Sequence, residues 1–407
     1  MRSACVTPIT RGYVSEMDIG YSPEQEALRT ELRTYYDNLL DEETVEALSH
    51  SHGIGQATKD VWKQMCTDGW AGIGWPKEYG GQARGPIDQF VFFDESMRAG
   101  APVPMLTLNT VGPTIMNYGT DWQKEFFLPK ILAGDLHFCI GYSEPGAGTD
   151  LAALQTRAVR DGDEYVINGQ KMWTSLAGGA DYCWLAVRTD PEAKKHKGIS
   201  VIVVPMDTPG ITIQPLRLMG EHDINATYFD DVRVPAKYLI GEENGGWGLI
   251  TNQLNHERVT LCSSGMPERI LTNVRKWAQD TKLPDGRRVI DQEWVQLNLA
   301  KVHAKLEYLR LANWKVAWSA STEKLHPADA SSVKVFGTEF YLDAYTMLME
   351  VLGPRAYLDA DAPESILRSQ LEAGIRGTII LTFGGGTNEL QRDLIAMFGL
   401  GFPRSAR

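Results

Sequence analysis

The chain of 407 residues is poor in cysteine, and its cysteines are far apart in sequence. They are Cys5, Cys66, Cys139, Cys183 and Cys262, and none forms a Cys-x-x-Cys pair. This distribution indicates neither a zinc cage nor a disulfide framework, and it fits a protein of a reducing cytoplasm. The eight histidines show no metal-ligand spacing either, so no metal site is expected.

The sequence also lacks a long apolar run and an excess of positive charge. No run approaches the roughly 18 apolar residues of a membrane span. The formal net charge is -12, which argues against nucleic-acid binding because phosphates require a basic surface. A local pocket for one phosphorylated ligand stays possible. Rossmann, P-loop and nucleophile-elbow motifs are absent as well.

The first residues allow two favoured interpretations. Residues 1–21 are expected either to be disordered or to follow a start codon set too early, with Met17 as the true start. Arginines without acidic residues before Glu16 also occur in organellar transit peptides. Regular structure is expected from Ser22, since Ser22-Pro23-Glu24-Gln25 places serine at an N-cap and proline at the first helical position.

Three regions differ in hydrophobic periodicity. Residues 22–135 have apolar residues at spacings of three and four, as in amphipathic helices. Residues 136–246 consist of short β-branched and aromatic runs bounded by Asp, Pro and Gly, which predict a β-barrel or sandwich. Residues 247–407 return to the helical period. The predicted fold class is α+β, with an N-terminal helical domain, a central β domain and a C-terminal four-helix bundle.

The bundle is expected to contain four long helical segments, at about 247–280, 290–320, 328–352 and 363–399. In the first, Gly265 and Pro267 predict a helix break or a kink. In the last, the three glycines at 384–386 are unfavourable inside a helix. They predict either a loop between helices, which is favoured, or a close approach of the backbone to a ligand.

Two segments of the central region together suggest a cofactor site. Tyr142-Ser143-Glu144-Pro145-Gly146-Ala147-Gly148-Thr149 is a turn of small residues whose backbone and hydroxyls can approach a ligand closely. Lys171-Met172-Trp173-Thr174-Ser175 then places a large flat ring beside two hydroxyls. The pair predicts a site for a planar, polar, phosphate-bearing cofactor. Taken alone, Trp173 would more often be a core residue.

A carboxylate on an apolar helix face is the candidate for acid-base chemistry. Ile250, Leu254, Glu257 and Leu261 share one face of a predicted helix. A carboxylate there must be paired, or its pKa rises. A raised pKa near neutrality suits a general base. A buried ion pair remains the alternative from spacing alone.

Together these segments resemble the acyl-CoA dehydrogenase family, and the resemblance covers nearly the whole chain. It rests on Glu144-Pro145-Gly146-Ala147-Gly148-Thr149-Asp150, Met172-Trp173-Thr174-Ser175, Asp231-Val232-Arg233-Val234-Pro235 and Gly386-Thr387-Asn388-Glu389. More narrowly, the chain resembles the base-bearing subunit of actinobacterial heteromeric members that act on steroid side chains.

The resemblance implies FAD as cofactor, bound between the β domain and the bundle. The implied FAD contacts are Tyr142, Ser143, Gly148, Thr149, Trp173, Thr174, Ser175, Thr387, Asn388 and Glu389. The implied contacts of the acyl-CoA substrate are Thr149, Asn255, Arg258, Gly385 and Gly386. The implied reaction is α,β-dehydrogenation of an acyl-CoA thioester to a trans-2-enoyl-CoA, with an electron-transfer flavoprotein as electron acceptor.

The family places its catalytic base at one of two positions. One lies just before the final Gly-Thr, where this chain has Gly385, which cannot abstract a proton. The other lies on the bundle helix that contains Asn255-His256-Glu257-Arg258. The resemblance therefore implies that Glu257 is the base.

Two departures from the family imply a second subunit. Residues 282–288 lack the Arg-x-x-Phe-Gly segment that reaches a neighbour's FAD, and residues 350–354 replace a Gln-x-Leu-Gly-Gly segment. A homologous partner would supply the missing arginine, in an α2β2 heterotetramer as the simplest closed arrangement. Two alternatives are a flavin oxidase or monooxygenase on the same fold, and a non-catalytic partner subunit.

Overall fold

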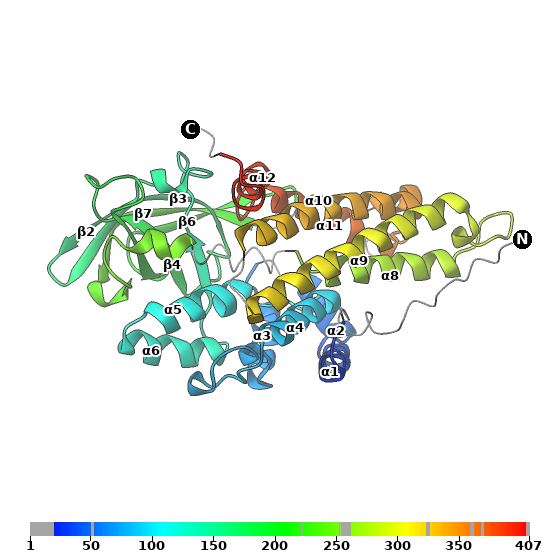
Figure 1. The fold of residues 1–407 in the computed structure, drawn as a ribbon, viewed down its shortest axis with the longest axis horizontal. Helices are drawn as coiled ribbons and strands as arrows, with labels where there is room; N and C mark the ends of the chain where they lie inside the picture. Colours follow the sequence, from blue (N-terminus) through cyan, green and yellow to red (C-terminus); the bar gives the residue numbers. More distant parts are fainter. Residues whose placement is uncertain are drawn as a thin grey trace, which may run out of the picture.

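The structure is a computed structural model. It describes residues 20–49, 53–220, 223–251, 253, 262–322, 326–358, 362–367 and 370–403. Within these ranges the order is helical, sheet, helical, as the sequence predicts (Figure 1). None of the helices in these ranges has both the length and the hydropathy to span a membrane.

The N-terminal part is a group of short helices. They are α1 (Pro23–Leu39), α2 (Glu42–Ser49), α3 (Gln56–Thr67), α4 (Pro86–Ala99), α5 (Gly112–Tyr118) and α6 (Asp121–Leu132). The predicted start of α1 is confirmed: the Ser22 hydroxyl accepts a 3.3 Å hydrogen bond from the Gln25 amide, and the Gln25 side chain accepts one from the Ser22 amide. Such a capping box contributes about 1 kcal/mol.

The central part is one eight-stranded sheet in the order β6-β7-β3-β2-β4-β5-β8, with β1 parallel to β4. The strands are β1 (Phe138–Gly141), β2 (Arg157–Asp161), β3 (Glu164–Ser175), β4 (Tyr182–Arg188), β5 (Ile199–Pro205), β6 (Ile211–Arg217), β7 (Asp223–Pro235) and β8 (Leu239–Ile240). Nearly every residue of strands β4 and β5 is buried, on both faces of the sheet. Helices α5 and α6 cover one of these two faces. The near-continuous apolar sequences of β4 and β5 are typical of such strands.

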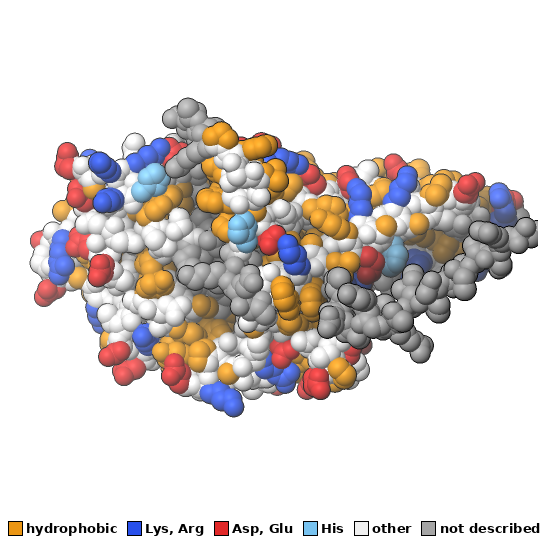
Figure 2. Space-filling model, viewed as in Figure 1, with side chains coloured by type: hydrophobic (Ala, Val, Ile, Leu, Met, Phe, Trp, Pro, Cys, Tyr) orange, Lys and Arg blue, Asp and Glu red, His pale blue; other side chains and the backbone are white. Residues whose placement is uncertain are grey.

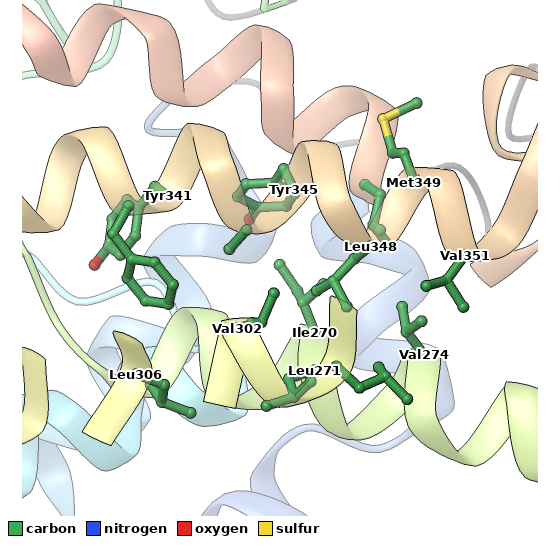
Figure 3. Close-up of a cluster of buried hydrophobic side chains, with 14 of the residues drawn as sticks. Ile270, Leu271, Val274, Val302, Leu306, Tyr341, Tyr345, Leu348, Met349 and Val351 are labelled. Carbon is green, nitrogen blue, oxygen red and sulfur yellow. The ribbon is translucent and has the colours of Figure 1, made fainter. Parts of the chain in front are cut away.

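The C-terminal part is built on three long helices, α8 (Gly265–Asp280), α9 (Glu293–Thr322) and α10 (Pro327–Leu352). Figure 3 shows their shared core, in which Ile270, Val302 and Leu348 point toward one another from the three helices. Burying a large apolar side chain of this kind stabilises the folded state by about 1.5–3 kcal/mol relative to leaving it exposed to water.

The prediction of one helical segment over residues 363–399 is wrong. The chain instead forms α11 (Gln370–Thr378), short turns, and α12 (Asn388–Leu394). The interruption lies at the glycine run, where Gly385 and Gly386 have φ of 67° and 96°. A Cβ on Gly386 would lie 2.7 Å from the Gln391 amide nitrogen, so no other residue fits there without rearrangement. The favoured loop interpretation is confirmed.

The predicted break near Gly265 is also confirmed. Helix α8 begins at Gly265 and places Pro267 in its first turn, where proline removes no needed donor. Its first amides bond to Asp94 of α4: the carboxylate accepts from the Ser264 amide at 2.8 Å and from the Gly265 amide at 3.0 Å. A buried side chain of the N-terminal part thus caps a helix of the bundle.

Candidate active site

The first predicted segment, residues 142–149, is an open turn directly after β1. Glu144 and Ala147 exchange backbone hydrogen bonds of 3.0 and 3.1 Å, and the Ser143 carbonyl accepts from the Met172 amide at 2.8 Å. A Cβ added at Gly146 or Gly148 would meet nothing within 4 Å in the part of the chain that the structure describes. The turn is therefore held against β3 while its glycine side stays accessible to a ligand.

A buried ion pair holds this turn in place. Lys171, which is 0% exposed, donates from Nζ to Glu144 Oε1 at 2.7 Å and to the Tyr142 carbonyl at 3.0 Å. The Glu144 carboxylate also accepts from the amides of Gln155 at 2.6 Å and Thr156 at 2.9 Å. Burial alone would raise the pKa of Glu144, but the Lys171 ammonium and these donors outweigh it, so the pKa is lowered.

Trp173 is presented to solvent by a distortion of β3. The register between β3 and β7 shifts between Lys171 and Thr174, and Trp173 has φ 62° in the left-handed region. Bulges re-aim side chains, and this backbone conformation costs a bulky residue about 1–2 kcal/mol. The ring is 55% exposed, so the alternative that Trp173 is a core residue is wrong.

The two hydroxyls after Trp173 lie on opposite sides of the strand. Ser175 is exposed, as Trp173 is, whereas Thr174 is fully buried. The Thr174 carbonyl accepts from the Asn225 side chain at 3.0 Å, and the Thr174 Oγ1 has no hydrogen-bond partner among the described residues. Side-chain contact with a ligand is therefore available to Ser175 and not to Thr174.

Tyr142 lies beneath the turn. Its ring belongs to the core between the sheet and the N-terminal helices. Its hydroxyl bonds to the Gln253 side chain, and the Trp184 indole donates to it at 3.2 Å. Gln253 precedes the segment that carries Glu257, so Tyr142 links the turn to the start of that segment. Asn255, Glu257 and Arg258 themselves lie outside the described residues.

The last predicted segment is the turn at residues 383–387 and the start of α12. The Thr387 hydroxyl caps α12 by accepting from the Leu390 amide at 3.2 Å, and Glu389 is exposed. Asn388 is buried, and its amide oxygen accepts from Lys334 Nζ at 2.8 Å. Sequence reasoning missed Lys334 because its only signal, a lysine in an apolar stretch of helix, does not indicate its contacts.

Two contacts join the sheet to the bundle at α11, which precedes this turn in the sequence. Arg376 of α11 donates to the Met219 carbonyl at 2.5 Å, and Gly220 packs against Gly377. Figure 1 shows α12 beside the sheet at this junction. The sheet side, which carries Trp173 on β3 next to β7, and the bundle side, which carries residues 383–389, thus belong to neighbouring elements.

The segments that depart from the family pattern have local roles. Residues 282–288 form a surface turn closed by a bridge between Lys282 and Arg288. The arginines of this turn pair within the chain, Arg287 with Asp285 at 2.7 Å and Arg288 with Asp291 at 2.8 Å. In the second segment, Glu350 accepts from the Asn298 side chain at 3.0 Å.

Comparison with known proteins identifies the family. The chain matches the acyl-CoA dehydrogenase N-terminal domain over residues 22–135, the middle domain over 139–232 and the C-terminal domain over 244–400. It is 58% identical over 400 residues to acyl-CoA dehydrogenase FadE26 of Mycobacterium tuberculosis, covering 96% of this chain and 100% of FadE26. It is 46% identical to FadE29 of the same organism, covering 96% and 100%.

Solved structures agree with this result. A chain of the ChsE4-ChsE5 complex from Mycobacterium tuberculosis matches with a TM-score of 0.90 and 58% identity, over 96% of this chain and 100% of that one. A chain of the Tcur3481-Tcur3483 steroid ACAD matches with a TM-score of 0.90 and 49% identity, with the same coverage. The chain belongs to the acyl-CoA dehydrogenase family, which confirms the resemblance seen in the sequence.

Proposed function

We propose that this chain is the base-bearing subunit of a heteromeric, FAD-dependent acyl-CoA dehydrogenase that acts on the CoA thioester of a steroid side chain. The observation that carries the proposal is the nearly full-length match, at 58% identity, to a chain of the two-protein ChsE4-ChsE5 complex. The match to a protein described as a steroid ACAD supports the substrate class.

The described residues fit FAD. Trp173 offers an exposed flat ring, which suits packing against an isoalloxazine. Ser143, Thr149 and Ser175 offer hydroxyls that are not fully buried, and Gly148 leaves space beside the turn. On the bundle side, Thr387 and Glu389 would border the cofactor, while Tyr142, Thr174 and Asn388 would contribute through backbone or by support. Bound FAD would supply the acceptor for the hydride that leaves the β-carbon.

In the proposed reaction, the carboxylate of Glu257 takes the α-proton of the thioester. The sequence periodicity predicts apolar neighbours for this residue, and such surroundings favour the neutral acid, as suits a general base. Gly385 stands at the alternative base position and has no proton acceptor. Asn255 and Arg258 would line the acyl-CoA channel together with Thr149, Gly385 and Gly386. Trp173 would exclude water from the reacting atoms.

Apolar residues on the surface support a partner chain. Helix α9 has a buried stripe and, on its other side, a second stripe of large apolar residues that are each 45% or more exposed: Trp294, Leu297, Tyr308, Leu311 and Trp318. A helix that is apolar on both sides is typical of burial on both sides. Further exposed apolar side chains, Phe398, Leu400 and Phe402, follow α12, and Figure 2 shows hydrophobic side chains gathered there.

Charge also supports a partner. The FAD pyrophosphate needs charge-assisted donors, and the arginines at 287 and 288 are paired with aspartates of their own turn. A homologous second chain would supply the missing arginine, in an α2β2 assembly. An electron-transfer flavoprotein would then take the electrons.

The test is to produce this chain alone and together with a homologous partner, and to measure FAD per chain, mass in solution and turnover of a steroid side-chain acyl-CoA. We expect little FAD and no turnover for the chain alone, and one FAD per pair of chains with turnover for the complex. An active homotetramer with FAD in every chain would contradict the heteromer. Rapid reoxidation of the product-bound reduced complex by air would favour an oxidase instead.

A further inference from the structure

Lys334, in the N-terminal third of α10, is a buried cation that no part of the proposed reaction uses. Its side chain is 0% exposed. Its Nζ donates to the Gly386 carbonyl at 2.7 Å and to Asn388 Oδ1 at 2.8 Å. Burying an ammonium is costly unless hydrogen bonds compensate for the lost water. Two of its compensating bonds therefore go to the turn that begins α12.

Two further side chains of α10, Thr338 and Glu339, also bond to the start of α12. The Asn388 amide nitrogen donates to Thr338 Oγ1 at 3.0 Å and to Glu339 Oε1 at 3.2 Å. Glu339 in turn accepts from Arg392 of α12 at 2.7 Å. Both ends of the Asn388 amide are thus engaged by α10, which makes Asn388 a brace between the helices.

The contact with Gly386 fixes the direction of a peptide group. The Gly386–Thr387 peptide is trans, so its carbonyl and its N–H point in opposite directions. Because Lys334 draws the carbonyl toward α10, the Thr387 N–H points away from α10. Gly386 has φ 96°, a conformation that glycine alone adopts easily, so the backbone by itself does not enforce this orientation.

We propose that Lys334 is a positioning residue: it orients the Gly386–Thr387 peptide so that the Thr387 N–H faces the bound FAD and acyl thioester. This inference rests on the proposed function. The cation acts through the peptide that it holds and makes no contact with the ligands itself.

The test compares Lys334→Met and Lys334→Gln with the control Ser331→Ala, all in the complex with the partner chain. Ser331 lies one turn earlier on α10 and bonds to the Gln391 side chain of α12 at 2.8 Å. Gln391 packs beside Gly386, so this control disturbs a neighbour of the turn but keeps the bond from Lys334 to the Gly386 carbonyl. Hydrogen exchange of the peptide covering residues 383–390 in FAD-depleted complexes measures how firmly the backbone of the turn is held. Fluorescence titration with FAD measures the affinity for the cofactor.

We expect faster exchange in this peptide for Lys334→Met than for Ser331→Ala. We also expect an FAD Kd higher by about tenfold or more, because the Thr387 N–H would no longer be held in position to donate to the ligand. Lys334→Gln should recover part of the affinity, because its amide can still donate to the Gly386 carbonyl.

Exchange and FAD affinity equal to those of Ser331→Ala would overturn the inference. If neither Lys334 variant folds, Lys334→Arg decides: it keeps the buried charge but displaces the donor from the Gly386 carbonyl, so exchange and affinity equal to those of Ser331→Ala would again overturn the inference. A wild-type complex that binds no FAD would contradict the proposed function instead, and the exchange data would still decide whether Lys334 fixes the turn.

Discussion

Lys171 Nζ lies 2.7 Å from Glu144 Oε1, and this contact joins the two segments that the sequence marks as a cofactor site. Both side chains are buried, and the carboxylate also accepts two backbone amides. The turn at residues 142–149 is therefore held by a cation from the strand that presents Trp173.

Removing the cation should destabilise the protein strongly. For Lys171→Met we expect a loss of about 3–5 kcal/mol of unfolding free energy, because Glu144 would be left buried without its partner. The double variant Lys171→Met with Glu144→Gln should recover at least half of the loss. Urea unfolding monitored at the tryptophans measures both. As a control, Lys195→Met breaks the exposed pair with Asp150 and should change stability by less than about 1 kcal/mol. A loss for Lys171→Met no greater than that of the control would contradict the assignment.

The same pair predicts an acid-dependent component of stability. The folded state lowers the pKa of Glu144 below its ordinary value of 4.5. A lowered carboxylate pKa gives stability that is fully present above 4.5 and is lost as the pH falls through the folded pKa. The stability difference between wild type and Glu144→Gln should thus be constant from pH 7 to about pH 5 and shrink below pH 4.5. Urea midpoints of both proteins between pH 3 and 7 measure it, and a difference that grows on acidification would be inconsistent with this sign.

Trp173 should be more important for ligand binding than for folding. In Trp173→Gly, the loss of contacts and the greater freedom of the unfolded chain are offset by relief of the left-handed backbone conformation at φ 62°. We expect the unfolding free energy to change by less than about 1 kcal/mol. FAD affinity and the flavin spectrum should change clearly. Trp173→Phe, which keeps a ring, should retain more affinity. A large stability loss with an unchanged spectrum would show that the ring serves the fold instead.

Glu257 is proposed as the base, so Glu257→Gln should abolish turnover while the complex still binds FAD. A rise in the barrier of about 5 kcal/mol or more is expected for loss of an essential proton acceptor. Steady-state turnover and FAD content of the complex measure this. Near-normal turnover of the variant would exclude Glu257 as the base.

Asp94 should be required for docking of the N-terminal helices on the bundle. Asp94→Ala removes the acceptor of the buried Ser264 amide and of the Ser263 and Ser264 hydroxyls, and leaves the Gly265 amide only its bond to Ser263 Oγ; we expect this to cost about 2–4 kcal/mol. Asp94→Asn retains one acceptor oxygen and should lose less. Thermal unfolding of the two variants compares them, and equal losses would show that the hydrogen bonds to α8 contribute little.

The sequence alone determined the family, the order of the three regions and some of the local boundaries. Ser22 begins α1 and the glycine run interrupts the last helical region, because capping and glycine conformation depend on a few adjacent residues. The turn at residues 142–149 and the Trp173 segment could likewise be recognised as motifs.

Only the tertiary structure decided which way these residues face and what holds them. The exposure of Trp173 depends on a register shift between β3 and β7, which a single strand sequence does not specify. Lys171 with Glu144, and Lys334 with Gly386, meet across 27 and 52 residues of sequence. Such contacts follow from the packing of sheet and helices. Periodicity predicts which face of an element is buried, but it does not predict which polar group a buried side chain will contact.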